Sequence, residues 1–179
     1  MHRPASPSVV CAVRITERKS QFDMDKNAFA PYPPMGWNSW DCYGAAVTEK
    51  ELRQNAEFVA NHLREHGWEY IVCDIQWYEP TADSSHYHSF ADLCMDEYGR
   101  VIPAPNRFPS AADGKGFGPI AEYVHSLGLK FGIHIMRGIP RQAVHQNTPV
   151  KGTTYTARQV AHPVLICPGV GGVNGFQSL

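Results

Sequence analysis

The sequence lacks an excess of charge of either sign. Its 16 lysine and arginine residues are balanced by 17 aspartate and glutamate residues, and the formal net charge is -1. Domains that bind nucleic acids or anionic membranes usually carry a basic patch or stripe, so this balance argues against both kinds of partner. It favours a neutral partner, and it does not indicate an oligomeric state.

Long apolar runs are also missing. A membrane-spanning helix needs ~20 consecutive apolar residues, and no run in this chain approaches that length. The segment Val9–Val13 is too short for the apolar core of a secretion signal, and Arg14 follows it at once. The sequence therefore predicts neither a membrane span nor export.

Cysteine is scarce and scattered. The 5 cysteines include no C-x-x-C pair, and they are Cys11, Cys42, Cys73, Cys94 and Cys167. An odd number without paired spacing is typical of reduced thiols rather than of a disulfide framework or a structural zinc site. Together with the missing export signal, this pattern predicts a cytoplasmic protein.

Motifs for cofactors and metals are equally sparse. The glycine-rich stretch Gly169–Gly175 lacks the preceding strand and the following helix that a phosphate-binding loop requires. His86 and His88 have the spacing of a metal-binding pair, but no accompanying carboxylate or cysteine pattern supports a metal site. We therefore predict no cofactor and no metal.

The chain is organised around one short aromatic stretch, Pro33–Tyr43. Two prolines favour an extended backbone at its start, and the pattern of Met35–Trp40 then predicts a short buried strand. Trp37 and Trp40 are either core fillers or a platform for a sugar, because a flat indole covers the apolar face of a sugar ring. In the second case Asp41, which follows directly, is placed to accept hydrogen bonds from hydroxyl groups.

A helix and a buried strand come next. Thr48 and Glu51 form a capping box that begins the helix, and Gly67 is placed to end it with a positive φ angle. A strand follows within Trp68–Trp77, apolar on both faces as in a covered parallel strand. The apolar residues of the helix recur at helical spacing and are Leu52, Ala56, Val59 and Leu63.

The same unit recurs later in the chain. Gly118 and Pro119 open a second helix, Gly128 ends it, and Leu129–Met136 is the next strand. A short helix is expected over Pro140–His145. This alternation predicts an α/β fold with a parallel sheet. Three βα units leave the sheet open, so we expect a truncated architecture.

A long loop separates the two units. It runs between Trp77 and Phe117 over about forty residues and is rich in Asp, Ser, His, Tyr and Pro. Loops of this length in compact domains are usually functional or disordered. Because the loop follows a strand, it belongs to the face on which α/β barrels and open α/β sheets build their sites.

Four motifs follow one another along the chain: Pro33–Trp40 with Tyr43 and Gly44, then Val72–Trp77, Asn106–Ser110 and Tyr123–Ile133. Taken together and in order, they resemble those of the α-galactosidase (melibiase) family, glycoside hydrolase family 27. The resemblance covers about Pro31 to Cys167 and implies a (β/α)8 TIM barrel, followed in the family by a β-sandwich. It also implies retaining hydrolysis of terminal α-D-galactosides.

The resemblance also suggests how the chain is divided. Residues 1–30 show no periodicity and are expected to be a flexible leader or an upstream extension. Residues 31–168 are expected to be a partial barrel that comprises the first three βα units. Residues 169–179 diverge from the family pattern and are expected to be an unstructured tail, as in a truncated or frame-shifted gene model.

Two residues match sugar-binding positions of the family. Trp40 matches the tryptophan of the first strand that lines the galactose subsite, although core packing remains an alternative. Asp74 matches the first of two adjacent aspartates that bind sugar hydroxyls at the end of the second strand. Burial of a carboxylate at the end of an apolar strand is unfavourable unless it is paired, which also favours a site role.

The sequence departs from the family pattern at two other positions. Ile75 replaces the second aspartate, and His134 stands where the family has a tyrosine. An apolar side chain at position 75 suits a sugar without an exocyclic hydroxymethyl group, such as β-L-arabinopyranose, and the family contains enzymes of that specificity. Arg137, just after the third strand, is expected to hold a sugar oxygen or a carboxylate, or to form a structural ion pair.

Retaining glycosidases use two carboxylates about 5 to 5.5 Å apart. In the family these residues follow the fourth strand and lie near the sixth, so both would fall beyond Leu179 and no catalytic residue is predicted here. Asp41 and Glu79 are expected to be polar pocket residues or residues that hold the loop. The favoured hypothesis is an α-galactosidase fragment that is inactive alone. The alternatives are a β-L-arabinopyranosidase fragment, a non-catalytic carbohydrate-binding fragment, or a reading frame that never folds.

Overall fold

The computed structural model describes residue 28, residues 31–161 and the backbone of residues 176–177. The expected leader therefore lies almost wholly outside the described residues. Contacts divide the chain into two units, residues 1–33 and 34–179. The account below concerns the second unit.

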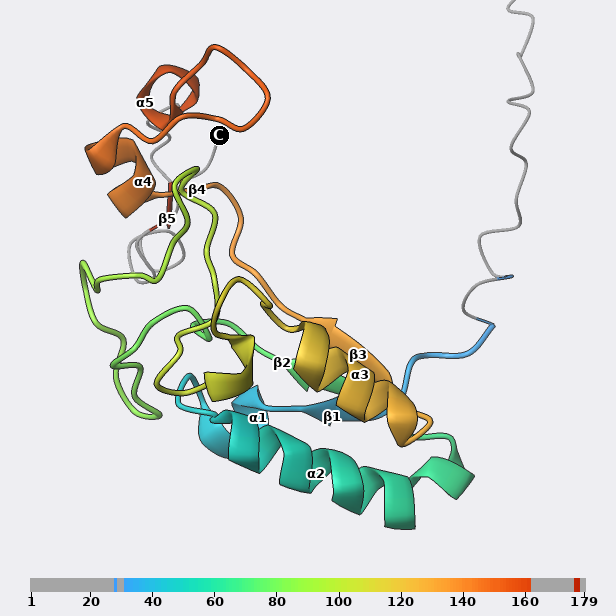
Figure 1. The fold of residues 1–179 in the computed structure, drawn as a ribbon. Helices are drawn as coiled ribbons and strands as arrows, with labels where there is room; N and C mark the ends of the chain where they lie inside the picture. Colours follow the sequence, from blue (N-terminus) through green and yellow to red (C-terminus); the bar gives the residue numbers. More distant parts are fainter. Residues whose placement is uncertain (1–27, 29–30, 162–175, 178–179) are drawn as a thin grey trace, which may run out of the picture. The chain divides into compact units, whose positions relative to one another are not determined.

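Three short strands form a parallel sheet in the order β1-β2-β3 (Figure 1). They are β1 (Gly36–Asn38), β2 (Tyr70–Cys73) and β3 (Lys130–Ile133). Both strand pairs are parallel, so all three strands end at the same edge of the sheet. The predicted α/β class and parallel sheet are confirmed, and each strand is shorter than the apolar stretch that predicted it.

The first long helix, α2 (Glu49–His62), begins at the predicted capping box. The amide of Thr48 donates to the Glu51 carboxylate at 2.8 Å, and the Thr48 hydroxyl accepts from the amide of Glu51. The helix ends earlier than predicted, because its last turn tightens into a 3-10 helix, η2 (Arg64–His66). Gly67 then adopts the expected positive φ of 88°.

The second long helix, α3 (Gly118–Ser126), follows a short 3-10 helix, η3 (Pro109–Ala111). Gly128, with a φ of 74°, turns the chain into β3 as predicted. Helices α2 and α3 share one apolar core with the sheet. Its buried members include Leu52, Ala56, Val59, Ile71, Ile120 and Val124.

One predicted strand boundary is wrong. The strand expected over Met35–Trp40 ends at Asn38, and Trp40 is the first residue of a short helix, α1 (Trp40–Tyr43). The cause is local, because the Asn38 side-chain oxygen accepts a hydrogen bond from the Trp40 amide at 2.8 Å. This bond satisfies a donor at the start of α1 and turns the chain out of the sheet.

After β3 the described residues form four short elements. They are β4 (Ile139–Pro140), α4 (Arg141–Gln146), α5 (Ala157–Val160) and β5 (Phe176–Gln177). The predicted short helix is present as α4. Strand β5 pairs with β4 in antiparallel fashion. The rest of the predicted tail, residues 169–175 and 178–179, lies outside the described residues.

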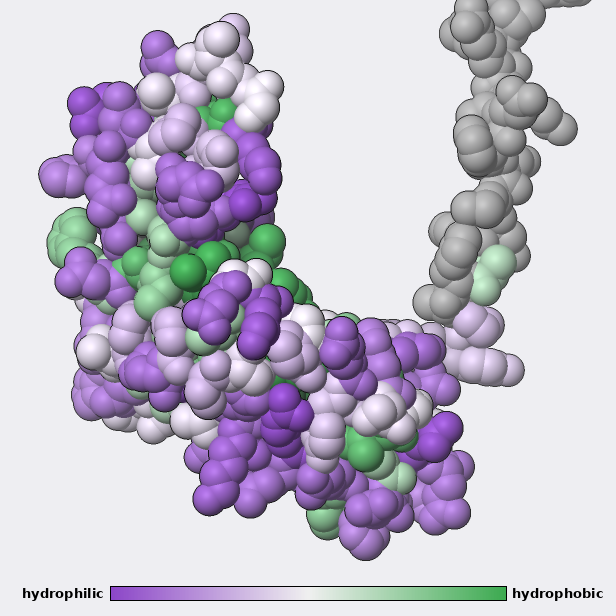
Figure 2. All heavy atoms as spheres, viewed as in Figure 1, coloured by the Kyte–Doolittle hydropathy of each residue, from purple (hydrophilic) through white to green (hydrophobic). Residues whose placement is uncertain are grey.

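The far side of β3 carries no neighbouring strand among the described residues. Two isoleucines at its carboxyl end are exposed, Ile133 at 46% and Ile135 at 56%. Figure 2 shows a band of apolar side chains on the face in view. Within the part of the chain that the structure describes, none of the helices has the length and apolarity needed to cross a membrane.

The cysteines of the described part are unpaired. Cys42 is exposed, Cys94 is half-buried and Cys73 is buried in the core. Burial raises the pKa of the Cys73 thiol to about 12, so this thiol stays protonated at neutral pH. These three residues agree with the predicted reduced thiols, and Cys11 and Cys167 lie outside the described residues.

Candidate functional site

The carboxyl edge of the sheet brings together residues that are far apart in the sequence. Cys73 of β2 pairs with Ile133 of β3, and the next residues along the two strands are Asp74 and His134. Ser39 follows β1 at the same edge. Parallel α/β sheets build their sites at this edge, because loops from neighbouring strands meet there.

Asp74 is held in one orientation. Its Oδ1 atom accepts a hydrogen bond from the Ile75 amide at 2.7 Å and lies 3.0 Å from Nδ1 of His134. The Oδ2 atom receives no hydrogen bond from the described residues. Although Asp74 is only 8% exposed, one carboxylate oxygen is thus left for a ligand.

Ser39 fixes the backbone of this residue. The Ser39 amide donates to the carbonyl oxygen of Val72 at 3.0 Å, and its hydroxyl accepts from the Asp74 amide at 2.9 Å. Ser39 is fully buried. The sequence analysis missed this residue, because its partner lies 35 positions away and a serine in a short strand motif is not distinctive.

Trp40 follows β1 at the same edge of the sheet and has an aromatic partner that was not predicted. Its indole stacks on the ring of Tyr87, with centroids 5.7 Å apart and planes inclined by 18°. Trp40 is half-buried, and Tyr87 is 44% exposed. Burial and the Asp74 carboxylate raise the pKa of the Tyr87 phenol.

The chain turns sharply after Asp74. Ile75 is half-buried, and Gln76 has a φ of 67°, an uncommon left-handed conformation for a residue other than glycine. Trp77 is buried and donates its indole N–H to the backbone oxygen of His134 at 2.9 Å. Trp77 and Tyr78 are both buried, and Trp77 also lines an apolar groove described below.

The remaining predicted site residues follow β3. His134 is mostly exposed, with 63% of its side chain accessible, and it contacts Asp74 as described. Arg137 is exposed and forms no hydrogen bond or ion pair within residues 31–161. The structure therefore joins His134 to the Asp74 site but does not join Arg137 to it, and a sugar-holding role for Arg137 stays a prediction.

Arg107 braces the loops that carry these residues. Its guanidinium is buried and donates to the backbone oxygens of Gln76 and Glu79 at 2.7 and 2.9 Å. It also donates to the backbone oxygens of Ala45 and Val47, in the loop after α1. One side chain thereby ties the turn after β2 to the loop after β1.

Glu79 is one of the residues expected to hold the loop, and it does so. Its side chain is 1% exposed, and its Oε1 atom lies 2.6 Å from Nδ1 of His88. His86 instead contacts Ser85 and Asp83. The two histidines thus have separate partners, and the described residues contain no cluster of three or more potential metal ligands.

Two cavities lie elsewhere. The larger, with a volume of about 750 Å³, is an apolar groove whose walls include Trp77, Val101, Ile133, Ile135 and Met136. Neither cavity is lined by Trp40 or Asp74. These two residues lie instead at the open carboxyl edge of the sheet.

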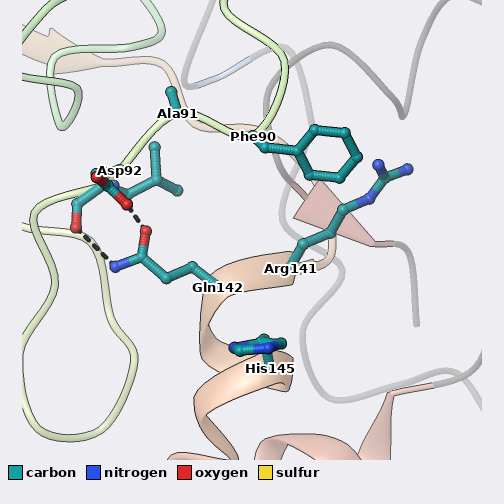
Figure 3. A pocket seen from close by; sticks show the side chains of 7 residues that line it. Phe90, Ala91, Asp92, Arg141, Gln142 and His145 are labelled. Carbon is teal, nitrogen blue, oxygen red and sulfur yellow. Dashed lines mark hydrogen bonds between the residues drawn. The ribbon is translucent and has the colours of Figure 1, made fainter.

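The smaller cavity, about 360 Å³, is shown in Figure 3. The side-chain amide of Gln142 pairs with the backbone of Leu93, accepting at 2.7 Å and donating at 3.0 Å. The Arg141 guanidinium lies 5.9 Å from the centroid of the Phe90 ring. None of the residues that the sequence singled out for a site lines this cavity.

The edge site combines two kinds of chemistry. The rings of Trp40 and Tyr87 offer flat apolar surface, and Asp74 Oδ2 offers a charged acceptor. A pyranose ring presents an apolar C–H face and hydroxyl groups at its rim, so it is a ligand that fits both features.

Comparisons with known proteins agree with this chemistry. The structure matches a β-L-arabinopyranosidase of glycoside hydrolase family 27 from Geobacillus stearothermophilus, solved in complex with arabinose, with a TM-score of 0.82 and 60% identity. An α-galactosidase from Coffea arabica is 34% identical over 120 residues, and one from Cyamopsis tetragonoloba is 34% identical over 110 residues. No family model matches the chain.

The chain spans only part of these relatives. The match to the arabinopyranosidase covers 88% of this chain but 36% of that enzyme. The matches to the two plant α-galactosidases cover 66% and 61% of this chain, and 27% and 22% of the relatives. The chain therefore spans well under half the length of each of these relatives.

Proposed function

Because the chain belongs to glycoside hydrolase family 27, we propose that it forms the sugar-binding part of a retaining glycosidase that acts on β-L-arabinopyranosides. The observation that carries this proposal is the pairing of Asp74 with Ile75 at the end of β2. One residue supplies an acceptor for sugar hydroxyls, and the next supplies an apolar surface.

Asp74 is suited to bind a sugar. Three interactions orient it, through the Ser39 hydroxyl, the Ile75 amide and the His134 imidazole. Its Oδ2 atom is left to accept hydrogen bonds, and bonds from hydroxyls to a carboxylate are among the stronger ones. A sugar bound there lies beside the aromatic surface of Trp40.

Ile75 selects among sugars of the same ring stereochemistry. β-L-Arabinopyranosides and α-D-galactopyranosides share the configuration of their ring hydroxyls and differ by the hydroxymethyl group on C5. A hydroxymethyl group next to Ile75 finds no hydrogen-bond acceptor in that side chain, and its desolvation is then uncompensated. The similarity to a β-L-arabinopyranosidase, at 60% identity, supports the same preference.

An α-galactosidase is the second candidate. It was the favoured hypothesis from the sequence, and the named α-galactosidases among the relatives support it. Both candidate activities would use Trp40 and Asp74. They differ in whether the bound sugar carries a hydroxymethyl group on C5. Binding of matched glycosides therefore separates them.

We further propose that this polypeptide alone binds its sugar without cleaving it. A retaining mechanism requires two carboxylates about 5 to 5.5 Å apart at the scissile bond. Glu79 is buried and paired with His88, so it is unavailable to a substrate. In this proposal, Asp74 accepts hydrogen bonds from the sugar hydroxyls. Neither of these two carboxylates is therefore available for a catalytic pair.

Isothermal titration of the purified chain tests the proposal. Methyl β-L-arabinopyranoside, methyl α-D-galactopyranoside and, as a control with an inverted C4 hydroxyl, methyl α-D-glucopyranoside are the ligands. We expect the arabinoside to bind most tightly and the glucoside not to bind. Tighter binding of the galactoside would favour the second candidate, and binding of none would refute both.

Hydrolysis is measured separately. The chain is incubated with p-nitrophenyl β-L-arabinopyranoside and p-nitrophenyl α-D-galactopyranoside, and release of p-nitrophenol is followed. We expect no release from either substrate. Turnover that is abolished together with sugar binding by Asp74→Asn would show that the chain contains its own catalytic groups.

A further inference from the structure

Tyr87 lies where a sugar on the Trp40 platform would meet it. The two rings are nearly parallel, inclined by 18°, and their centroids are 5.7 Å apart. This spacing is typical of an offset stack, in which each ring covers only part of the other. Tyr87 keeps 44% of its surface exposed, so it stays accessible to a ligand bound at Trp40.

Tyr87 also lies near the polar part of the site. The Asp74 carboxylate contributes to the raised pKa of the Tyr87 phenol, after burial. A sugar that stacks on Trp40 has the Tyr87 ring next to it, because the two rings are themselves stacked. No other tyrosine of the described residues stacks on Trp40.

The residue after Tyr87 fixes the loop to the body of the fold. Nδ1 of His88 lies 2.6 Å from Oε1 of Glu79, and Glu79 is 1% exposed. The backbone of Glu79 is itself held, because its carbonyl oxygen accepts a hydrogen bond from Arg107 at 2.9 Å. A rigid, buried carboxylate thus holds the loop one residue away from the Tyr87 ring.

We propose that Tyr87 is a substrate-contacting residue of the sugar site and that His88, through its pairing with Glu79, is the residue that positions it. This inference rests on the proposed function, since it concerns the same sugar. It assigns a role to two residues of the long loop between β2 and α3 that lie outside the family motifs quoted above. The composite surface of Trp40 and Tyr87 is suited to the C–H face of a pyranose ring.

The test uses the isotope-labelled chain and nuclear magnetic resonance. Methyl β-L-arabinopyranoside is titrated into the wild-type chain, and the Kd is taken from the shift of the Trp40 indole N–H resonance, assigned with Trp40→Phe. Tyr87→Ala removes the second ring, and we expect Kd to rise about three- to tenfold. Tyr87→Phe keeps the ring and is expected to bind within about twofold of wild type. Phe90→Leu, at an exposed aromatic of the same loop, is the control and leaves Kd unchanged.

His88 is tested with a matched pair of variants. His88→Ala removes the partner of Glu79 and releases the loop. We expect the Trp40 indole resonance of the unliganded chain to shift and sugar binding to weaken. His88→Asn restores both readouts, because the Asn amide nitrogen takes the place of Nδ1. The dispersion of the remaining spectrum shows whether each variant is folded, so a local change is distinguished from unfolding.

The outcomes separate this inference from the proposed function. If wild type binds the arabinoside and a folded Tyr87→Ala binds it equally well, the role of Tyr87 is refuted while the proposed function stands. If His88→Ala leaves the Trp40 resonance and Kd unchanged, the positioning role is refuted. If wild type binds no glycoside, the proposed function fails and this inference fails with it.

Discussion

Nδ1 of His134 lies 3.0 Å from Oδ1 of Asp74, although the two residues are 60 positions apart in the sequence. The parallel register of β2 and β3 produces this contact, because each residue directly follows a paired strand position. The contact occupies one oxygen of the carboxylate and leaves the other open. Oδ2 of Asp74 is therefore the atom through which this carboxylate can bind a ligand.

Asp74→Asn is expected to weaken binding of methyl β-L-arabinopyranoside about 10- to 100-fold. The amide is neutral, and hydrogen bonds to a charged acceptor contribute about 1.5 to 3 kcal/mol. Asp96→Asn is the matched control, since Asp96 also accepts from backbone amides, those of Tyr98 and Arg100. Calorimetric titration gives both Kd values. Equal binding by Asp74→Asn and wild type would show that the sugar does not contact this carboxylate.

Ile75→Asp is expected to reverse the sugar preference. A carboxylate at this position supplies an acceptor for the C5 hydroxymethyl group, so the ratio of galactoside to arabinoside affinity rises about 10- to 100-fold. Ile75→Leu keeps the position apolar and preserves the preference for arabinoside. Titration of each variant with both methyl glycosides measures the ratio. An unchanged ratio in Ile75→Asp would mean that residue 75 does not face C5.

Gly36→Ala is expected to destabilise the fold by about 1 to 3 kcal/mol. A Cβ atom at this position of β1 would overlap the backbone oxygen and the Cβ atom of Tyr70 on β2, so the two strands would have to separate. Gly118→Ala is the control at the start of α3, where an added Cβ meets nothing within 4 Å. We expect it to be neutral or stabilising by up to about 1 kcal/mol. Urea unfolding of both variants compares the effects, and equal stabilities would argue against the close β1–β2 approach.

Glu49 should make stability depend on pH. Burial raises the pKa of this carboxyl, but hydrogen bonds from Ser110 and Arg53 outweigh burial and hold it below its usual value. A lowered folded pKa contributes stability above the unfolded pKa, and this contribution is lost as pH falls through the folded value. The loss is therefore expected below about pH 4.5.

The variant Glu49→Gln isolates this effect. It is expected to be less stable than wild type at pH 7 and to lose less stability than wild type between about pH 5 and 3. Glu122→Gln, at an exposed position of α3, is the control and follows the wild-type curve. Unfolding free energies measured across this pH range give the comparison. Parallel curves for wild type and Glu49→Gln would contradict the assigned pKa shift.

Local signals in the sequence were sufficient to predict the long helices and the parallel strands. The capping box at Thr48 and the glycines at positions 67 and 128 lie where they were predicted, because each depends only on nearby backbone geometry. The end of β1 was misplaced at Trp40. The apolar pattern favoured a longer strand, and the hydrogen bond from the Trp40 amide to Asn38 decided against it.

The site was predictable only in part. Trp40 and Asp74 could be singled out because they stand at the ends of short apolar segments and match family positions. Ser39 and Arg107 lie within the quoted family motifs but were given no role of their own, and Tyr87 was not singled out at all. Their roles depend on partners distant in the sequence, which local patterns do not reveal.

A crystal structure of the chain with methyl β-L-arabinopyranoside tests the central claim most directly. We predict that the sugar ring lies against the aromatic surface of Trp40 and donates a hydroxyl hydrogen bond to Asp74 Oδ2, with C5 directed toward Ile75. A glycoside bound elsewhere, in either of the two cavities or on the far side of the sheet, would contradict the account.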